Sequence, residues 1–408
     1  MLKDGMIIKR LVYTLLILLV CNFNVCKAQA ISSKEAFNKT YKALGTELNQ
    51  ALNEKNYAKA EQLNKVIISN YESLPDSLRK EIWFNYGGQY YNVACYESLQ
   101  NKKKEALKHF ELAYKNGYVS YKHILEDTDL DNIRKSREFK KILAKIREEG
   151  DYLYILQKSS SYAQNERTDT LPQFTYMDAN DSNLIRVREY FKLDSVAGKG
   201  DEISKIKNIL TYIHNKIRHD GQHENPKGRN AIALAEPCKD GSRGLNCRGL
   251  AIVLNECYLS MGFKSRFITC LPKKYINDCH VINAVYSKTL NKWIWIDPTN
   301  NAWVMDEKGN LLSIQEVREH LRKGLPLVLN KEANWNNKEQ TTKEDYLDNY
   351  MAKNLYYLSC TLSSEFGAED RPFRANYYTA LMPTGYNNDV EKGSYIVNDD
   401  NWFWQTPN

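Results

Sequence analysis

After its first thirty residues, the sequence has no long apolar run. No later stretch reaches the roughly eighteen uncharged apolar residues that a spanning helix needs, so we expect no membrane span in the mature chain. A strong charge of one sign is missing too. The net charge is +7, and four basic residues against Asp4 place +3 of it in the first thirty residues. A dispersed +4 over the remaining 378 residues argues against a nucleic-acid partner.

Cysteine pairs of the Cys-x-x-Cys type are also missing. The nine cysteines are scattered, and the run from Cys238 to Cys279 has no tight pair of the kind that zinc sites use. We therefore predict neither a metal nor a cofactor. The composition, 42% hydrophobic and 26% charged, is that of a globular protein and excludes wholesale disorder. A length of 408 residues indicates two or three domains.

Residues 1–30 have the three parts of a secretory signal. Lys9-Arg10 precedes the apolar run Leu11–Val20, and Ala28-Gln29-Ala30 supplies the small residues that cleavage needs. We predict a signal peptide over 1–30 and an exported protein, periplasmic or extracellular. A lipid anchor on Cys21 is less favoured, because the bulky Val20 precedes it. Cleavage leaves seven cysteines, and an odd number predicts at least one free thiol.

Residues 31–155 have the composition of successive helices. Ala94, Ala106 and Ala113 lie at intervals of 12 and 7 residues, which lets two antiparallel helices approach closely with a turn near Asn101. This pattern resembles a tetratricopeptide repeat, and residues 56–61 resemble a second, degenerate copy. We expect a tetratricopeptide-like helical domain. It is either a packed scaffold or the surface for a protein partner.

The rest of the chain divides by composition into three parts. Residues 156–195 are polar and rich in turns, and we interpret them as a linker or lead-in segment. Residues 196–310 form the predicted core, where a helix over 203–217 carries a buried stripe with His214 at its partly exposed edge. Residues 311–408 are an aromatic-rich extension that we expect to pack on the core. It opens with a capping box, formed by a serine at 313 and a glutamate at 316.

Cys247 lies at the predicted start of a buried helix. A loop with Gly241 and Gly244 precedes it, an apolar face runs to position 261, and Gly262 ends the helix. The free N–H groups and the positive dipole end at such a position stabilise a thiolate and lower its pKa. The same N–H groups can stabilise an oxyanion. The sequence therefore indicates a nucleophilic thiol.

Three strands follow, over 263–271, 280–286 and 292–297. If Ser287–Leu290 is a four-residue hairpin loop, Tyr286 faces Asn291 and His280 faces Asp297 directly. Directly opposed side chains have Cβ atoms about 4.5–5.5 Å apart, which places imidazole and carboxylate within hydrogen-bonding reach. The three residues then have the roles of nucleophile, base and orienting acid.

These stretches resemble the transglutaminase-like superfamily. The resemblance rests on Asn246–Ala251, Met261–Phe267, Cys279–Val285 and Trp295–Thr299, and it covers about a quarter of the chain. It implies an α+β fold in which a papain-like core with an antiparallel sheet follows the helical domain in the sequence. It also assigns the catalytic roles to Cys247, His280 and Asp297. Val281-Ile282 stands where many relatives have Ala-Trp, which bears on substrate type.

The predicted function is thiol-dependent acyl transfer or hydrolysis on an amide of a peptide or protein substrate. The alternative is a non-catalytic peptide- or glycan-binding module on the same fold. Gln222 is the candidate side chain for the oxyanion, whereas His219 and His223 are expected to be exposed or to lie behind the site. Cys95 and Cys257 are expected in the core. The disulfide pairing of four cysteines stays open: Cys238, Cys270, Cys279 and Cys360.

Overall fold

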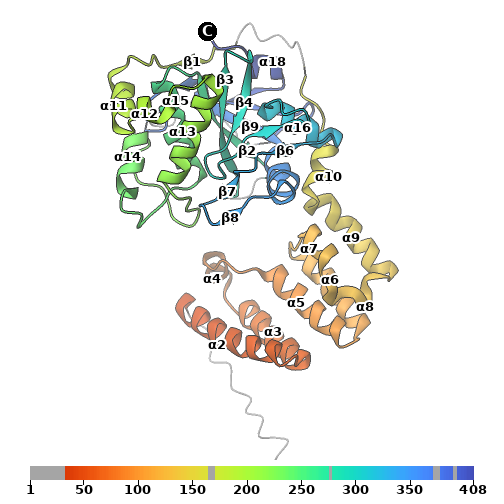
Figure 1. The fold of residues 1–408 in the computed structure, drawn as a ribbon. Coiled ribbons are helices and arrows are strands. Elements are labelled where there is room, and N and C mark those ends of the chain that lie inside the picture. The colour runs from red at the N-terminus through yellow and green to blue at the C-terminus, as the bar shows by residue number, and fades with distance from the viewer. Residues whose placement is uncertain (1–32, 164–170, 275–277, 371–376, 389–392) are drawn as a thin grey trace, which may run out of the picture. The chain divides into compact units, whose positions relative to one another are not determined.

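The computed structural model describes residues 33–163, 171–274, 278–370, 377–388 and 393–408 (Figure 1). The predicted signal peptide therefore lies outside the described residues. The chain forms two compact units, residues 1–151 and 152–408. No helix among the described residues is long and apolar enough to cross a membrane.

The first unit is built from helices alone within its described part. Asn101, in a left-handed conformation, makes the predicted turn between α5 and α6, and Ala94, Ala106 and Ala113 are all fully buried. Small buried residues allow the close approach that the spacing predicted. The elements are α2 (Lys34–Asn53), α3 (Tyr57–Glu72), α4 (Asp76–Glu81), α5 (Tyr86–Leu99), α6 (Lys103–Lys115), α7 (Tyr121–Glu126), η1 (Thr128–Leu130), α8 (Asp131–Arg134) and α9 (Arg137–Gly150).

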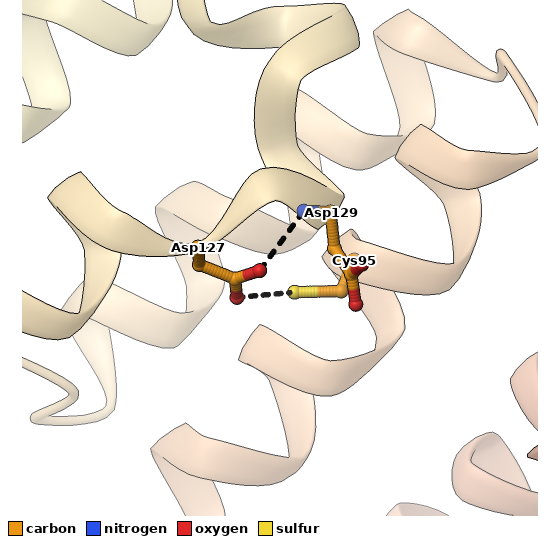
Figure 2. A group of neighbouring side chains, drawn as sticks. All are labelled: Cys95, Asp127 and Asp129. Carbon is orange, nitrogen blue, oxygen red and sulfur yellow. Dashed lines mark hydrogen bonds between the residues drawn. The ribbon is translucent and has the colours of Figure 1, made fainter.

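The core of this unit is aromatic and closely packed. Phe110 of α6 stacks on Phe139 of α9 with ring centroids 4.8 Å apart, and both side chains are fully buried. Cys95 is buried as expected, and its thiol donates to the carboxylate of Asp127 at 3.6 Å (Figure 2). The same carboxylate caps η1 through the N–H of Asp129 at 2.9 Å. These contacts connect α5 to the start of η1.

The second unit contains a six-stranded sheet with the order β12-β11-β9-β2-β3-β4. Neighbouring strands are antiparallel, as predicted, except for the edge pair β11–β12, which is parallel. The bounds are β2 (Ser265–Leu271), β3 (His280–Ser287), β4 (Lys292–Ile296), β9 (Tyr357–Thr361), β11 (Tyr378–Leu381) and β12 (Tyr395–Val397).

Helices cover both faces of this sheet (Figure 1). Val281, Val285 and Ile294 pack against the first group of helices, whereas Ile282, Ala284 and Trp295 pack against the second. The first group is α11 (Ser182–Tyr190), α12 (Leu193–Ala197), α13 (Glu202–Lys216), α14 (Ala231–Ala235), η2 (Glu236–Cys238) and α15 (Cys247–Ser260). The second is α10 (Tyr152–Gln157), α16 (Ile314–Lys323), the π-helix η3 (Glu344–Met351), α17 (Ala352–Asn354) and α18 (Asp400–Phe403).

The C-terminal segment is part of the sheet rather than an addition to it. Strand β9 pairs directly with β2, so the boundary drawn at residue 310 from the sequence divides one sheet. Ser313 and Glu316 form the predicted capping box of α16. The remaining short strands are β1 (Thr175–Tyr176), β5 (Val304–Met305), β6 (Val328–Leu329), β7 (Asn334–Trp335), β8 (Glu339–Gln340) and β10 (Ser363–Ser364).

Aromatic residues of the C-terminal segment pack around a buried arginine. The guanidinium of Arg266 lies 4.4 Å from the ring centroid of Trp293 and 5.3 Å from those of Phe403 and Trp404. The Arg266 side chain is 2% exposed, so these rings replace much of its hydration. Packing therefore accounts for part of the aromatic richness of the extension.

The stacked core of the helical unit predicts a large loss of stability for Phe110→Ala. The substitution removes a fully buried ring and leaves a cavity, and we expect the free energy of unfolding to fall by about 3–5 kcal/mol. Lys104→Ala, at an exposed position of the same helix, should change it by less than about 0.5 kcal/mol. Denaturant unfolding followed by circular dichroism measures both. Equal effects would contradict this packing.

Candidate active site

Cys247 is the first residue of α15, as the sequence predicted. The side chain of Asn246 caps the helix by accepting the N–H of Gly249 at 3.1 Å. Two hydrogen bonds fix Asn246 to Asn225. The Asn225 amide N–H donates to Asn246 Oδ1 at 2.7 Å, and the Asn225 amide oxygen accepts the Asn246 backbone N–H at 3.0 Å. A Cβ on Gly249 would lie 2.7 Å from the Asn225 amide, so any larger residue there would displace Asn225 from this cap. The cysteine is thus fixed at a helix N-terminus.

His280 and Asp297 meet, but not through the predicted register. Tyr286 pairs with Trp293 rather than with Asn291, so the strands are shifted by two residues from the prediction. The turn begins one residue later than expected, after Ser287, and ends at Asn291, whose φ is +51°. A shift of two leaves every side chain on its predicted face, because side chains alternate with period two. His280 and Asp297 are therefore diagonal neighbours.

The His280–Asp297 contact is short and buried. His280 Nε2 lies 2.8 Å from Asp297 Oδ2, with the two residues 2% and 0% exposed. The carboxylate also accepts the Asn300 amide at 3.0 Å, the Thr299 N–H at 2.7 Å and the Tyr346 hydroxyl. Burial by itself raises the pKa of Asp297, but the His280 charge and these donors outweigh it and lower the pKa to about 2.

The thiol and the imidazole form a second coupled pair. Burial works against the charged form of both groups, but each stabilises the other by hydrogen bonding and charge, with Asp297 acting on His280 as well. The result lowers the pKa of Cys247 and raises the pKa of His280 to about 10. The backbone N–H of Val281 and the charge of Arg248 also lower the pKa of Cys247. Because Asp297 occupies Nε2, Nδ1 is the nitrogen that faces the thiolate. The arrangement favours a thiolate–imidazolium pair.

A pocket of about 340 Å³ opens beside His280. Its walls come from the loop after α13, the residues after Asp297, the β7–β8 hairpin and η3. The described lining residues include two carboxylates and no lysine or arginine. They are His219, His280, Thr299, Asn300, Trp335, Glu339, Gln340, Thr341, Thr342, Asp345, Tyr346 and Tyr350.

Three predictions need correction: the oxyanion candidate Gln222, and the expected positions of His219 and His214. Gln222 is exposed and does not line this pocket; its N–H donates to Asp220 at 3.2 Å within its own turn. His219, expected to be exposed or behind the site, lines the pocket instead. His214 is buried rather than partly exposed, with Nδ1 2.9 Å from the Pro298 carbonyl. His223 is exposed, as expected. No local pattern distinguishes these positions, because the wall is assembled from distant loops.

The seven described cysteines are all free thiols, so none of the open pairings is formed. Cys257 is buried, as predicted, and Cys238, Cys270 and Cys360 are buried too. Among the described residues, the group that could hold a metal ion is Cys95, Asp127 and Asp129, whose ligand atoms lie within 4.8 Å of one another (Figure 2). Asp127 already accepts the Tyr91 hydroxyl at 2.6 Å. Capping and packing account for this group.

The coupled pair predicts an unusual pH profile for alkylation. Because the pKa of Cys247 is lowered, its iodoacetamide alkylation rate should reach half its maximum below the ordinary thiol pKa of about 8.5. In His280→Ala the midpoint should move to higher pH, because the imidazole no longer opposes the effect of burial on the thiol pKa. Peptide mapping over a pH series measures the rates. Cys279, whose pKa burial raises, is the slow internal standard.

His223→Ala is the matched control, since this exposed histidine lies outside the pocket. It should leave the profile of Cys247 unchanged. A wild-type midpoint at or above that of Cys279 would contradict the thiolate–imidazolium pair.

Comparison with known proteins gives a family match, a short sequence match and a structural match. Residues 190–298 match the transglutaminase-like superfamily. A stretch of 58 residues is 41% identical to a chloroplastic protein of Arabidopsis thaliana, covering 14% of this chain and 17% of that protein. The chain thus spans about a sixth of that relative's length. A solved structure of a proposed cysteine protease from Cytophaga hutchinsonii covers 37% of this chain and 51% of its own, at 16% identity and a TM-score of 0.23.

The matched range contains Cys247, His280 and Asp297, together with α15 and the strands β2 to β4. It ends at residue 298, so Trp335, Tyr346 and the other pocket residues after Asn300 come from outside it. Residues 190–298 are therefore a transglutaminase-like domain.

Proposed function

We propose that this protein is an exported, thiol-dependent amide hydrolase or acyltransferase that acts on a peptide or protein through an acyl-enzyme on Cys247. The observation that carries the proposal is the buried 2.8 Å contact between His280 and Asp297, next to Cys247 at the start of α15, since the imidazole acts on the pKa of that thiol. The charges are already arranged for attack, with a lowered thiol pKa and a raised imidazole pKa. The transglutaminase-like domain supports the same class of chemistry.

In the first half of the reaction, the Cys247 thiolate attacks the carbonyl carbon of the amide. A C–S bond forms, the carbonyl π pair moves to oxygen, and the N–H of Cys247 at the helix start can donate to that oxygen. The pair then returns, and the C–N bond breaks. Protonated His280 gives its Nδ1 proton to the leaving nitrogen, so an amine departs and a thioester remains.

In the second half, water or an amine attacks the thioester carbon. Neutral His280 takes the proton of the attacking group, the C–S bond breaks, and the thiolate leaves as the imidazolium returns. Asp297 keeps Nδ1 directed at the sulfur by holding Nε2, and it stabilises the imidazolium at both stages. Hydrolysis and amine transfer use the same three side chains: Cys247, His280 and Asp297.

The alternative is a non-catalytic peptide- or glycan-binding module on the same fold. The helical unit is the candidate surface for a protein partner in either case. The buried ion pair favours the enzyme, because a binding module has no need of a charged histidine held against a partly exposed thiol.

The acyl-enzyme is directly testable with p-nitrophenyl acetate. Wild-type protein should release a burst of nitrophenolate and carry one acetyl group on Cys247 in peptide mass spectra. Cys247→Ser should lose both signals. Asp297→Asn should slow acylation by about 10²-fold or more, because the histidine loses its orienting charge. Adding a fluorescent primary amine then separates the two acceptors by amide formation.

Cys279→Ser is the matched control, because it removes the neighbouring partly exposed thiol and leaves the three residues in place. It should acylate at the wild-type rate. Wild-type protein that is correctly folded but never acetylated on Cys247 would favour the binding module.

A further inference from the structure

Almost every hydrogen-bond donor that lines the pocket beside His280 is already used. Asn300 and Tyr346 donate to Asp297, and Tyr350 donates to the Cys279 carbonyl at 3.4 Å. On the hairpin side, Gln340 donates to two carbonyls, and Thr341 and Thr342 donate to neighbouring side chains. Glu339 and Asp345 are carboxylates, and the Thr299 hydroxyl has no partner among the described residues but is buried away from solvent. A substrate in this pocket therefore meets few donors.

His219 is the exception. The indole N–H of Trp335 donates to His219 Nδ1 at 3.1 Å. An indole nitrogen can only donate, so Nδ1 must be the unprotonated nitrogen, and the proton of the neutral ring lies on Nε2. Nε2 has no hydrogen-bond partner within the described part of the chain. A Cβ on Gly221 would lie 3.2 Å from Cε1 and 3.7 Å from Nε2 of His219, so this edge of the ring lies beside the glycine.

The backbone of His219 is held firmly next to the nucleophile's helix. Its N–H donates to Asn336 at 2.6 Å, and its carbonyl accepts the Asn336 amide at 3.0 Å. On the other side, His219 forms a β-bridge with Leu245, two residues before Cys247. The ring is thus anchored between the Trp335 hairpin and the segment that leads into α15.

His219 also stays neutral while its neighbour is charged. Burial, and then the positive charge of His280, lower the pKa of His219 to about 4. At neutral pH it therefore does not compete with His280 as a base. Its neutral ring carries one N–H, on Nε2, and keeps that proton at neutral pH.

Resting on the function proposed above, we infer that His219 Nε2–H is the side-chain donor to the substrate carbonyl oxygen, and that Trp335 is the positioning residue that fixes its tautomer. When the sulfur–carbon bond forms, the carbonyl π pair moves to oxygen, and the N–H stabilises that charge without transferring its proton. When the leaving group departs, the pair returns and the hydrogen bond weakens. This role replaces the one predicted for Gln222.

Two reactions of the same thiol test the assignment. Acylation by p-nitrophenyl acetate builds charge on a carbonyl oxygen, whereas alkylation by iodoacetamide does not pass through that oxyanion. His219→Leu should lower the second-order acylation constant about 10²–10³-fold and change the alkylation constant of Cys247 less than about 3-fold. His219→Gln restores an N–H donor of similar reach and should recover at least about 10-fold of the loss. The acylation constant of Trp335→Phe should lie between those of His219→Leu and the wild type, since either nitrogen of His219 can then carry the proton.

The outcomes separate the two proposals. If His219→Leu acylates like the wild type, or if alkylation falls as far as acylation, the donor role is wrong and the function of Cys247 stands. If Gln fails to improve on Leu while both variants keep the wild-type melting temperature, the donor role is wrong as well. If wild-type Cys247 is alkylated but never acylated, the proposed function fails, and this inference fails with it.

Discussion

The buried charge of Asp297 is the constraint on which the second unit depends. A carboxylate without solvent is unstable unless a positive partner and several donors surround it. His280 supplies the charge, and the backbone N–H of Thr299 and the Asn300 amide supply donors from the turn that follows. The hydroxyl of Tyr346 completes the set from η3, far along the chain. The site is therefore complete only when the C-terminal segment is folded against the sheet.

The same requirement explains why the matched family range is not a body of its own. Residues 190–298 carry the thiol, the imidazole and the carboxylate, but Tyr346 and the pocket wall lie beyond them. Strand β9 lies between β2 and β11 in the sheet. Two kinds of contact therefore join residues 190–298 to the C-terminal segment: the backbone pairing of β2 with β9 and the hydrogen bond from Tyr346 to Asp297. The candidate site residues of 190–298 can be recognised from the sequence, whereas their dependence on Tyr346 and strand β9 cannot.

The hairpin shows how a wrong register can still give the right contact. The turn between β3 and β4 lies at 288–291, one residue later than predicted, which shifts the pairing by two positions. An odd shift would have moved Asp297 to the opposite face and separated it from His280. An even shift keeps the face and replaces a direct neighbour with a diagonal one. Face is set by the parity of the sequence, whereas register depends on the turn.

The sequence by itself determined what is local: the helix that begins at Cys247 and ends before Gly262, the strands on either side of the hairpin, and the capping box of α16. It also singled out Cys247, His280 and Asp297 as the candidate site. Periodicity, caps and breakers act over a few residues, so they can be read along the chain. Only the tertiary structure decided the placement of β9 within the sheet, the donors around Asp297, and the exchange of Gln222 for His219 at the pocket. These depend on contacts between segments far apart in the sequence, for which no local pattern exists, because burial and neighbours are properties of the folded chain alone.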